Sequence, residues 1–361
     1  MGNLRGCREM KGIVLAGGAG TRLHPVTLAT SKQLLPVYDK PLIYYPLSVL
    51  MLAGIREILV ITTPVDRAAF VRVLGNGHRF GLKLAYAEQQ APKGIAEAFI
   101  IGADYVGDSP VTLILGDNIF FGGGLPGLLT QAMARERGAS VFAYHVDDPQ
   151  RYGVVNFDER DRPVAIEEKP AKPLSNWAIT GVYVYDKGVA NIARSLRPSA
   201  RGELEITDLN RAYLEAGKLN VHRLGRGYAW LDAGTHDSLL EASNFIRAIE
   251  VRQGVKIGCL EEIALRNGWI DAGEVERAIG SLKSSTYARY LERVLREKRR
   301  QSLKAVSADA ANRKPATASR HASGRPSPPL PQAPGSPRRS SPSPPPNDCD
   351  AQLAPQSPRV D

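Results

Sequence analysis

Short apolar runs alternate with amphipathic stretches along the first 120 residues. Unbroken apolar runs of four to eight residues are typical of strands buried on both faces, whereas a 3.6-residue apolar spacing predicts helices. Strands are expected at 12–16, 57–62, 84–88 and 111–115. Helices are expected at 40–53, 65–74 and 95–103. This alternation predicts parallel βαβ crossovers, and therefore an α/β fold with a doubly wound, mostly parallel sheet.

After about residue 140 the pattern becomes rich in strands separated by turn residues. The expected strands are 141–145, 153–157, 164–168, 179–185 and 228–231. Helical spacing returns at 205–215 and 235–251, and 259–299 predicts two or three smaller helices. The foldable chain, 10–300, thus divides into an α/β part at 10–139, an inserted β-rich part at 140–235 and C-terminal helices at 236–300.

The two ends of the chain differ from its body in composition. Residues 301–361 hold half of the 26 prolines, many of them in Ser-Pro pairs. Such a segment cannot bury enough apolar surface to offset its chain entropy, so we expect a disordered Pro/Ser/Arg-rich tail. Residues 1–9 are interpreted as a leader, because Met10 is an equally good start.

Composition excludes several classes of protein. The three cysteines, Cys7, Cys259 and Cys349, are far apart in sequence, which argues against a disulfide framework and favours a reducing, cytoplasmic setting. No apolar stretch is long enough to cross a bilayer, so no membrane partner is expected. The net charge of +10 is concentrated near 293–300 and in the tail. The rest of the sequence has no basic stripe interleaved with aromatic residues, so the net charge indicates no specific nucleic-acid partner.

A glycine-rich loop follows the first predicted strand. Gly17, Gly18 and Gly20 leave backbone N–H groups free to face an anion, and Arg22 and Lys32 follow on the same connection. The spacing matches neither the dinucleotide fingerprint nor a Walker loop. A tight turn that merely uses glycine is the alternative, but the two cations favour a polyphosphate site.

Two acids follow two apolar strands that are distant in sequence. Asp117 comes directly after 111–115, and Asp232 directly after 228–231. A single acid at such a place is usually a turn or helix cap. Two of them beside a phosphate loop predict a site for one Mg²⁺, an ion that takes one or two protein carboxylates and fills its shell with water and phosphate oxygens.

Further polar residues could bind a sugar or a base. Glu168 and Lys169 end the strand at 164–168, where a carboxylate suits sugar hydroxyls and an ammonium suits a phosphate. An ordinary surface ion pair is the alternative. Gly153 and the Thr180–Gly181 pair would let a sugar approach the backbone, and the Gln89 amide could read one edge of a nucleobase.

Eight motifs recur in a characteristic order. They are GGAGTRL, SKQLLP, YDKPLIYYPL, LGDN, RYGVV, EEKP, RGELEITD and GRGYAWLDAGTHDSL. In order and spacing the chain resembles the sugar nucleotidyltransferase family over roughly residues 10–296. The resemblance implies a Rossmann-like nucleotidyltransferase fold, Mg²⁺ as cofactor, a homotetramer, and the conversion of dTTP and α-D-glucose 1-phosphate into dTDP-glucose and pyrophosphate. Such a reaction begins the route to dTDP-rhamnose-type sugars.

The resemblance also assigns roles by matched position, with 10–139 mainly binding nucleotide and 140–235 mainly binding sugar. The implied nucleotide-binding residues are Gly17, Gly18, Gly20, Thr21, Arg22, Lys32, Gln33, Gln89, Gly94 and Asp117. The implied sugar-phosphate residues are Asn118, Gly153, Glu168, Lys169 and Thr180. Arg22, Lys32 and Lys169 would be catalytic, and Asp117 and Asp232 would hold the metal.

Three positions depart from the family pattern, namely Lys93, Glu97 and Ala233. Lys93 and Glu97 lie beside the expected base pocket, and Ala233 lies next to a metal acid, so altered affinity is expected rather than lost chemistry. Two other functions stay open. One is uridylyl transfer to the same sugar phosphate, and the other is a non-catalytic nucleotide-sugar sensor on the same fold.

Overall fold

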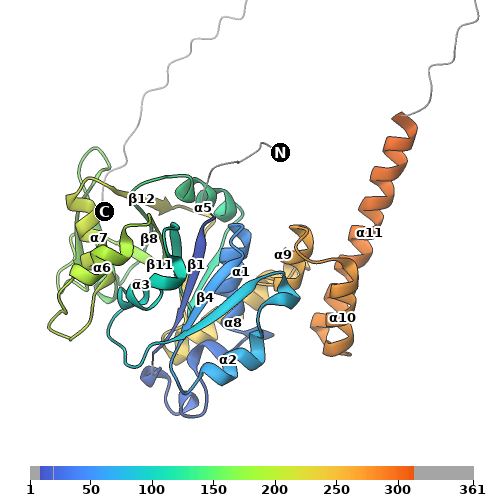
Figure 1. Cartoon of the computed structure of the whole chain (residues 1–361), viewed down its shortest axis with the longest axis horizontal. Coiled ribbons are helices and arrows are strands. Elements are labelled where there is room, and N and C mark those ends of the chain that lie inside the picture. The colour runs from blue at the N-terminus through green and yellow to red at the C-terminus, as the bar shows by residue number, and fades with distance from the viewer. Residues whose placement is uncertain (1–8, 19, 313–361) are drawn as a thin grey trace, which may run out of the picture. The chain divides into compact units, whose positions relative to one another are not determined.

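The computed structural model describes residues 9–18 and 20–312. Four parallel strands form one side of the main sheet, from its edge inward in the order β5 (Lys83–Glu88), β4 (Glu57–Thr62), β1 (Lys11–Ala16) and β6 (Val111–Leu115). β1 pairs with β4 on one side and β6 on the other. Figure 1 shows β1 beside β4. The carboxyl ends of these strands therefore share one edge, where open α/β sheets bind their ligands. The predicted α/β fold with a mostly parallel central sheet is confirmed.

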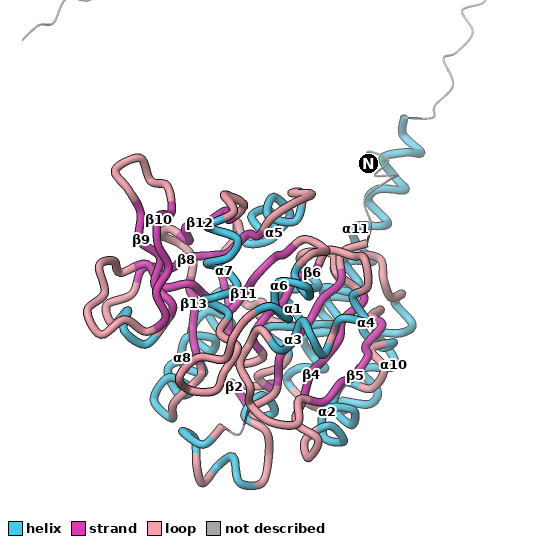
Figure 2. Tube along the Cα trace, turned by 60° about the vertical axis from the view of Figure 1, so that its left-hand side comes forward, coloured by secondary structure: helices cyan, strands magenta, loops and turns pink. Residues whose placement is uncertain are grey.

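The β-rich part extends the same sheet. β11 (Trp177–Tyr185) runs antiparallel to β6, with Val182 opposite Ile114. Around it lie β8 (Ala139–His145), β9 (Gly153–Phe157), β10 (Pro163–Glu168) and β12 (Leu219–Leu224). β9 continues from β11 to β10, and β8 also pairs with β11 and carries β12. Figure 2 shows β8–β10 gathered at one end of the sheet and β4 and β5 at the other.

Successive side chains of a strand point to opposite faces of the sheet, and both faces of the central strands are buried. In β1, Val14 and Ala16 belong to one apolar core, and Ile13 and Leu15 belong to the other. The first core is covered by α1, α2, α5 and the C-terminal helices α9–α11. The second is covered by α3, α4, α6 and α7. Helices on both faces make the sheet doubly wound.

The helices are α1 Tyr44–Leu52, α2 Arg67–Leu74, α3 Glu97–Ile101, α4 Ala103–Val106, α5 Leu125–Met133, α6 Val189–Ser195, α7 Ile206–Glu215, α8 His236–Gln253, α9 Leu260–Arg266, α10 Ala272–Leu282 and α11 Thr286–Asn312. Two small antiparallel pairs add to them, β2 (Pro36–Val37) with β3 (Lys40–Pro41), and β7 (Asn118–Phe121) with β13 (Ala229–Asp232). Among the residues described, no helix is long and apolar enough to span a bilayer.

Some boundaries differ from those expected. The helix expected at 40–53 begins only at Tyr44, because the preceding residues form β2 and β3. α11 continues to Asn312, past the boundary that composition placed at residue 301. Its Lys, Arg, Glu and Ala residues are good helix formers, and the dense prolines begin only after it. The rest of the expected tail, 313–361, and nearly all of the expected leader lie outside the described residues.

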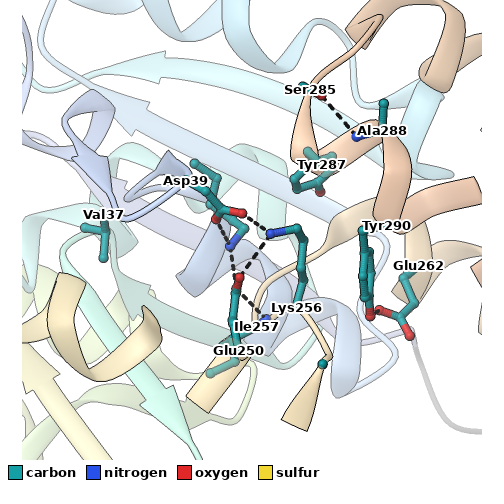
Figure 3. Close-up of polar contacts among 12 residues, drawn as sticks. Val37, Asp39, Glu250, Lys256, Ile257, Glu262, Ser285, Tyr287, Ala288 and Tyr290 are labelled. Atoms are coloured by element: carbon teal, nitrogen blue, oxygen red, sulfur yellow. Dashed lines mark hydrogen bonds and ion pairs between the residues drawn. The ribbon is translucent and has the colours of Figure 1, made fainter. Parts of the chain in front are cut away.

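A buried ion cluster attaches the β2–β3 hairpin to the C-terminal helices. Glu250 of α8 accepts hydrogen bonds from Lys40 at 2.9 Å and Lys256 at 3.0 Å, and Asp39 contacts both lysines. Figure 3 shows Asp39, Glu250 and Lys256 turned toward one another. Each charge is balanced by neighbours of opposite sign, as buried charges require. The β2–β3 hairpin, which follows Lys32 in sequence, is thus held in place by this ion cluster.

Candidate active site

A cavity of about 540 Å³ opens at the carboxyl ends of β1 and β6 and extends toward β9–β11. Ten of the predicted residues line it: Gly17, Arg22, Gln89, Gly94, Asp117, Asn118, Gly153, Glu168, Lys169 and Asp232. They come from six separate stretches of the chain between positions 17 and 232. The fold therefore brings most of the predicted side chains to one place.

The glycine loop lies at the expected nucleotide end of the cavity, which Gly17 and Arg22 line. Gly18 and Gly20 have φ angles of 134° and 59°, conformations that glycine adopts without steric cost. A short 3₁₀ turn, Thr21–Leu23, follows, and Thr27 closes the loop by donating its hydroxyl to the Gly20 carbonyl at 2.8 Å. This arrangement turns the Arg22 guanidinium into the cavity.

The two acids meet because β13 pairs with β7. Asp232, the last residue of β13, lies directly opposite Asn118, the first residue of β7, in the antiparallel register. Asp117 immediately precedes that register position, and its carbonyl accepts a hydrogen bond from the Ala233 N–H at 3.2 Å. Asp117 and Asp232 therefore share one end of the same two-stranded ribbon, although 115 residues separate them in sequence.

The charges around the acid pair are unevenly distributed. Burial alone would raise the pKa of Asp117, but the contacting Lys32 ammonium and a hydrogen bond from Asn118 hold it below its usual value. Burial and the nearby Asp117 charge raise the pKa of Asp232, against the opposing effects of Lys32, Arg22 and Arg151. The pair therefore carries one carboxylate in direct contact with a lysine and one whose ion pair, with Arg151, is long at 3.9 Å.

Asn118 is held in a single orientation. The indole N–H of Trp230 donates to Asn118 Oδ1 at 2.6 Å, and Asn118 Nδ2 donates to Asp117 Oδ1 at 2.9 Å. Because an indole can only donate, the oxygen of the amide must face Trp230 and its nitrogen must face the acid. Trp230 thus fixes Asp117 through Asn118, a role that the sequence did not reveal.

The expected sugar end of the cavity is built around Glu168. Its Oε1 lies 3.1 Å from Lys169 Nζ and 3.4 Å from Arg201, and its Oε2 accepts the Thr207 hydroxyl at 2.6 Å. Glu168 and Lys169 are adjacent in sequence, yet both line the cavity. This is possible because Lys169 has a φ of 44°, which breaks the alternation of the strand at its end. Tyr152 accepts the Lys169 N–H at 3.0 Å and fixes the turn.

Several residues that line the cavity were not predicted from the sequence. They are Arg151, Arg201, Glu203, Glu205, Thr207 and Trp230. All six lie in the motifs RYGVV, RGELEITD and GRGYAWLDAGTHDSL, but no role followed from their spacing. Arg201 makes a bidentate ion pair with Glu205, at 2.8 and 2.9 Å. This pair anchors its guanidinium beside Lys169, because both cations contact Glu168.

Six predicted residues do not line the cavity itself: Gly18, Gly20, Thr21, Lys32, Gln33 and Thr180. Lys32 reaches its edge by contacting Asp117, and the buried Gln33 accepts a hydrogen bond from Ser31 at 2.6 Å. Thr180 is fully buried between Ile179 and Gly181, which both line the cavity. Because strand residues alternate, its side chain faces away, and the sugar-phosphate role predicted for it does not fit this geometry.

The donor set at the acid pair suits Mg²⁺. Within the described chain, no group of three or more His, Cys, Asp or Glu side chains could enclose a metal. Two carboxylates facing a cavity beside a phosphate loop are instead the partial set that Mg²⁺ uses, with phosphate oxygens and water supplying the other ligands. The carboxylate of Asp232, whose only ion pair among the described residues is the 3.9 Å contact with Arg151, is the side chain that a divalent ion would compensate.

Comparison with known proteins identifies the class. A family model described as nucleotidyl transferase matches residues 11–249, which include every predicted site residue. The chain therefore belongs to the nucleotidyl transferase family. A glucose-1-phosphate thymidylyltransferase of Neisseria meningitidis is 57% identical over 288 residues, covering 80% of this chain and all of that one. One from Mycolicibacterium smegmatis is 56% identical over 286 residues, covering 79% and 99%. Within the family, this chain groups with the glucose-1-phosphate thymidylyltransferases.

Solved structures agree with this placement. A Bacillus anthracis structure assigned to the same enzyme is 43% identical, with a TM-score of 0.62 over 66% of this chain and 95% of that one. A UDP-glucose pyrophosphorylase complexed with UDP-glucose has a TM-score of 0.60 at 22% identity, which shows a shared fold only.

Proposed function

We propose that the chain transfers a thymidylyl group from dTTP to α-D-glucose 1-phosphate, producing dTDP-glucose and pyrophosphate with Mg²⁺ as cofactor. The observation that carries this proposal is the single cavity, in which a glycine phosphate loop, an acid pair and an ion-rich sugar end meet. Relatives that are more than half identical across nearly their whole length are glucose-1-phosphate thymidylyltransferases.

The chemistry needs no general base. A sugar-phosphate oxygen is already an anionic nucleophile at neutral pH, so the obstacle is bringing two anions together and stabilising the departing pyrophosphate. Positioning and electrostatics dominate such phosphoryl-type transfers. Arg22 and Lys32 neutralise the triphosphate of dTTP. Lys169 and Arg201 draw the attacking sugar phosphate toward the α-phosphorus of that triphosphate.

Asp117 and Asp232 would hold Mg²⁺, which when bound supplies positive charge to the triphosphate. The chain's own residues orient the rest. Gln89 and Gly94 face the base, and Glu168 offers its carboxylate to sugar hydroxyls. Asn118, fixed by Trp230, keeps Asp117 turned toward the cavity. In-line attack follows when both substrates occupy their ends of the cavity.

Uridylyl transfer is the nearest alternative, because thymine and uracil present the same hydrogen-bonding edge. A non-catalytic sensor on the same fold would be expected to lack at least one charged group of the mechanism. Here Arg22, Asp117, Lys169 and Asp232 all line the cavity, and Lys32 contacts Asp117. Retention of the whole set favours an active transferase.

A pyrophosphate-release assay tests the proposal. Purified protein is supplied with glucose 1-phosphate, Mg²⁺ and each nucleoside triphosphate in turn. The highest kcat/KM is expected with dTTP and the second with UTP. Release no faster than in buffer for every nucleotide, together with calorimetric binding of dTDP-glucose, would instead identify a sensor.

The setting of the reaction is part of the proposal. A reducing, cytoplasmic setting agrees with Cys259, which is free and buried. That the reaction begins the synthesis of dTDP-rhamnose-type sugars is implied by the family resemblance. A homotetramer is implied by the family resemblance alone.

A further inference from the structure

The side-chain amide of Gln89 is held by two acceptors. Gln89 follows β5, is only 5% exposed and lines the cavity. Its Nε2 donates to Glu97 Oε2 at 2.8 Å and to the Gly94 carbonyl at 3.3 Å. A carboxylate and a backbone carbonyl accept hydrogen bonds and donate none. The nitrogen end of the amide must therefore point toward Glu97, the first residue of α3.

The oxygen end of the same amide then points the other way. A Cβ atom added to Gly17 would lie 2.5 Å from Gln89 Oε1, so this oxygen sits directly over the first glycine of the phosphate loop. Gly17 and Gly94 line the same cavity as Gln89. The cavity wall beside the phosphate loop thus presents a hydrogen-bond acceptor, and Glu97 is the side chain that turns it there.

We infer that Glu97 is a positioning residue that sets the base preference of the site by holding Gln89 Oε1 toward the base. This inference rests on the proposed function, in which Gln89 contacts the nucleobase. Thymine and uracil carry a donor, N3–H, from which Oε1 can accept a hydrogen bond. Cytosine carries an acceptor at N3, and two facing acceptors leave both atoms without a donor inside a buried site. A site built to hydrogen-bond one edge rejects the wrong edge strongly.

A glutamate is more decisive here than a glutamine. With a glutamine at position 97, either amide could donate to the other, so that Gln89 could turn its nitrogen toward the base as well. Only the weaker contact with the Gly94 carbonyl, at 3.3 Å, would then favour the orientation seen. The carboxylate of Glu97 removes that freedom, because it accepts through either of its oxygens.

Two substitutions test the inference. Glu97→Met keeps the length of the side chain and removes the acceptor, whereas Glu97→Gln keeps an acceptor and adds a donor. The measurement is kcat/KM for dTTP and for dCTP, each with glucose 1-phosphate and Mg²⁺. The dTTP:dCTP ratio should fall about tenfold in Glu97→Met and by less in Glu97→Gln, chiefly through KM, since one hydrogen bond to a charged group is lost. Asp104→Asn, at an exposed position on α4 away from the cavity, should leave the ratio unchanged.

A double mutant separates positioning from a structural effect. In a Gln89→Met background no amide remains to be oriented, so adding Glu97→Met should leave the ratio where Gln89→Met alone put it. A ratio unchanged in Glu97→Met, an equal loss of kcat for both nucleotides, or a further fall in the double mutant would overturn the inference.

Calorimetric titration with dTDP and dCDP makes the same comparison without turnover. If the unaltered protein releases no pyrophosphate but its dTDP:dCDP affinity ratio falls in Glu97→Met, the proposed reaction fails and the inference stands. If turnover is normal and the affinity ratio does not move, the inference fails alone.

Discussion

The same chemical change at the two acids should affect folding stability in opposite directions. Asp117→Asn removes the partner of Lys32, whose ammonium contacts Asp117 and which is only 8% exposed as a residue. A buried cation left without its partner costs 3–5 kcal/mol in fully buried cases. The Asp117 side chain is 19% exposed, so the pair is not fully buried. We therefore expect Asp117→Asn to lower the unfolding free energy by about 2–3 kcal/mol.

Asp232→Asn should behave differently. Its pKa is raised by burial and by the Asp117 charge, so the ionised carboxylate is unfavourable in the folded protein at neutral pH. Replacing it by a neutral amide of the same shape relieves that cost, and the protein should be equally stable or about 1 kcal/mol more stable. Both variants should lose about 10²–10³-fold in kcat, because each removes a charge that the transition state requires.

The assay pairs urea unfolding with pyrophosphate release, both at pH 7.5 and fixed salt. Asp104→Asn, at an exposed position on α4, serves as the matched control and should change neither quantity. If Asp232→Asn proved as destabilising as Asp117→Asn, the uneven charge distribution described for this pair would be wrong. Unchanged turnover in both variants would refute the metal assignment.

Two further predictions concern a glycine and a histidine. Gly94→Ala should raise KM for dTTP at least tenfold in steady-state assays, because the new Cβ would lie 2.3 Å from the Leu204 carbonyl and φ is +100°. Burial, with the nearby Arg135 charge, lowers the pKa of His222, so below about pH 6.5 the unfolded chain binds a proton that the folded chain excludes. The unfolding free energy should therefore fall from pH 7 to pH 5, and His222→Phe, which can keep the stacking on Phe142, should flatten that fall in urea titrations.

The parts of the fold that sequence predicted well are those decided by local pattern. The strands expected at 57–62, 111–115 and 153–157 match β4, β6 and β9 at both ends, because their apolar runs stop at turn residues. The strand β12 and the helices α5 and α6 were not predicted. Most side chains of β12 are only half-buried, so its sequence shows no strong alternation.

The candidate site was predictable in its components and not in its connections. Residues such as Arg22 and Asp117 stand next to strand ends, which is a local signal. The pairing that brings Asp232 to Asp117 is a register between β13 and β7, and it depends on contacts across more than a hundred residues. Arg201 lies in a loop, and its place beside Lys169 depends on the ion pair with Glu205. Such partners become visible only when the chain is folded.

The two ends of the cavity are joined by the backbone as well as by the substrates. Leu204 donates its N–H to the Lys93 carbonyl at 2.7 Å and accepts the Ala96 N–H at 3.1 Å. The loop at 89–96, which would contact the base in the proposed function and is called the base loop here, is thus hydrogen-bonded to the segment that carries Arg201 and Thr207. Arg201 and Thr207 lie three residues to either side of Leu204. A shift of the base loop on nucleotide binding must therefore move, or be resisted by, the groups around Glu168. Because binding free energies couple reciprocally, the sugar phosphate must in turn alter the affinity for nucleotide wherever that shift occurs.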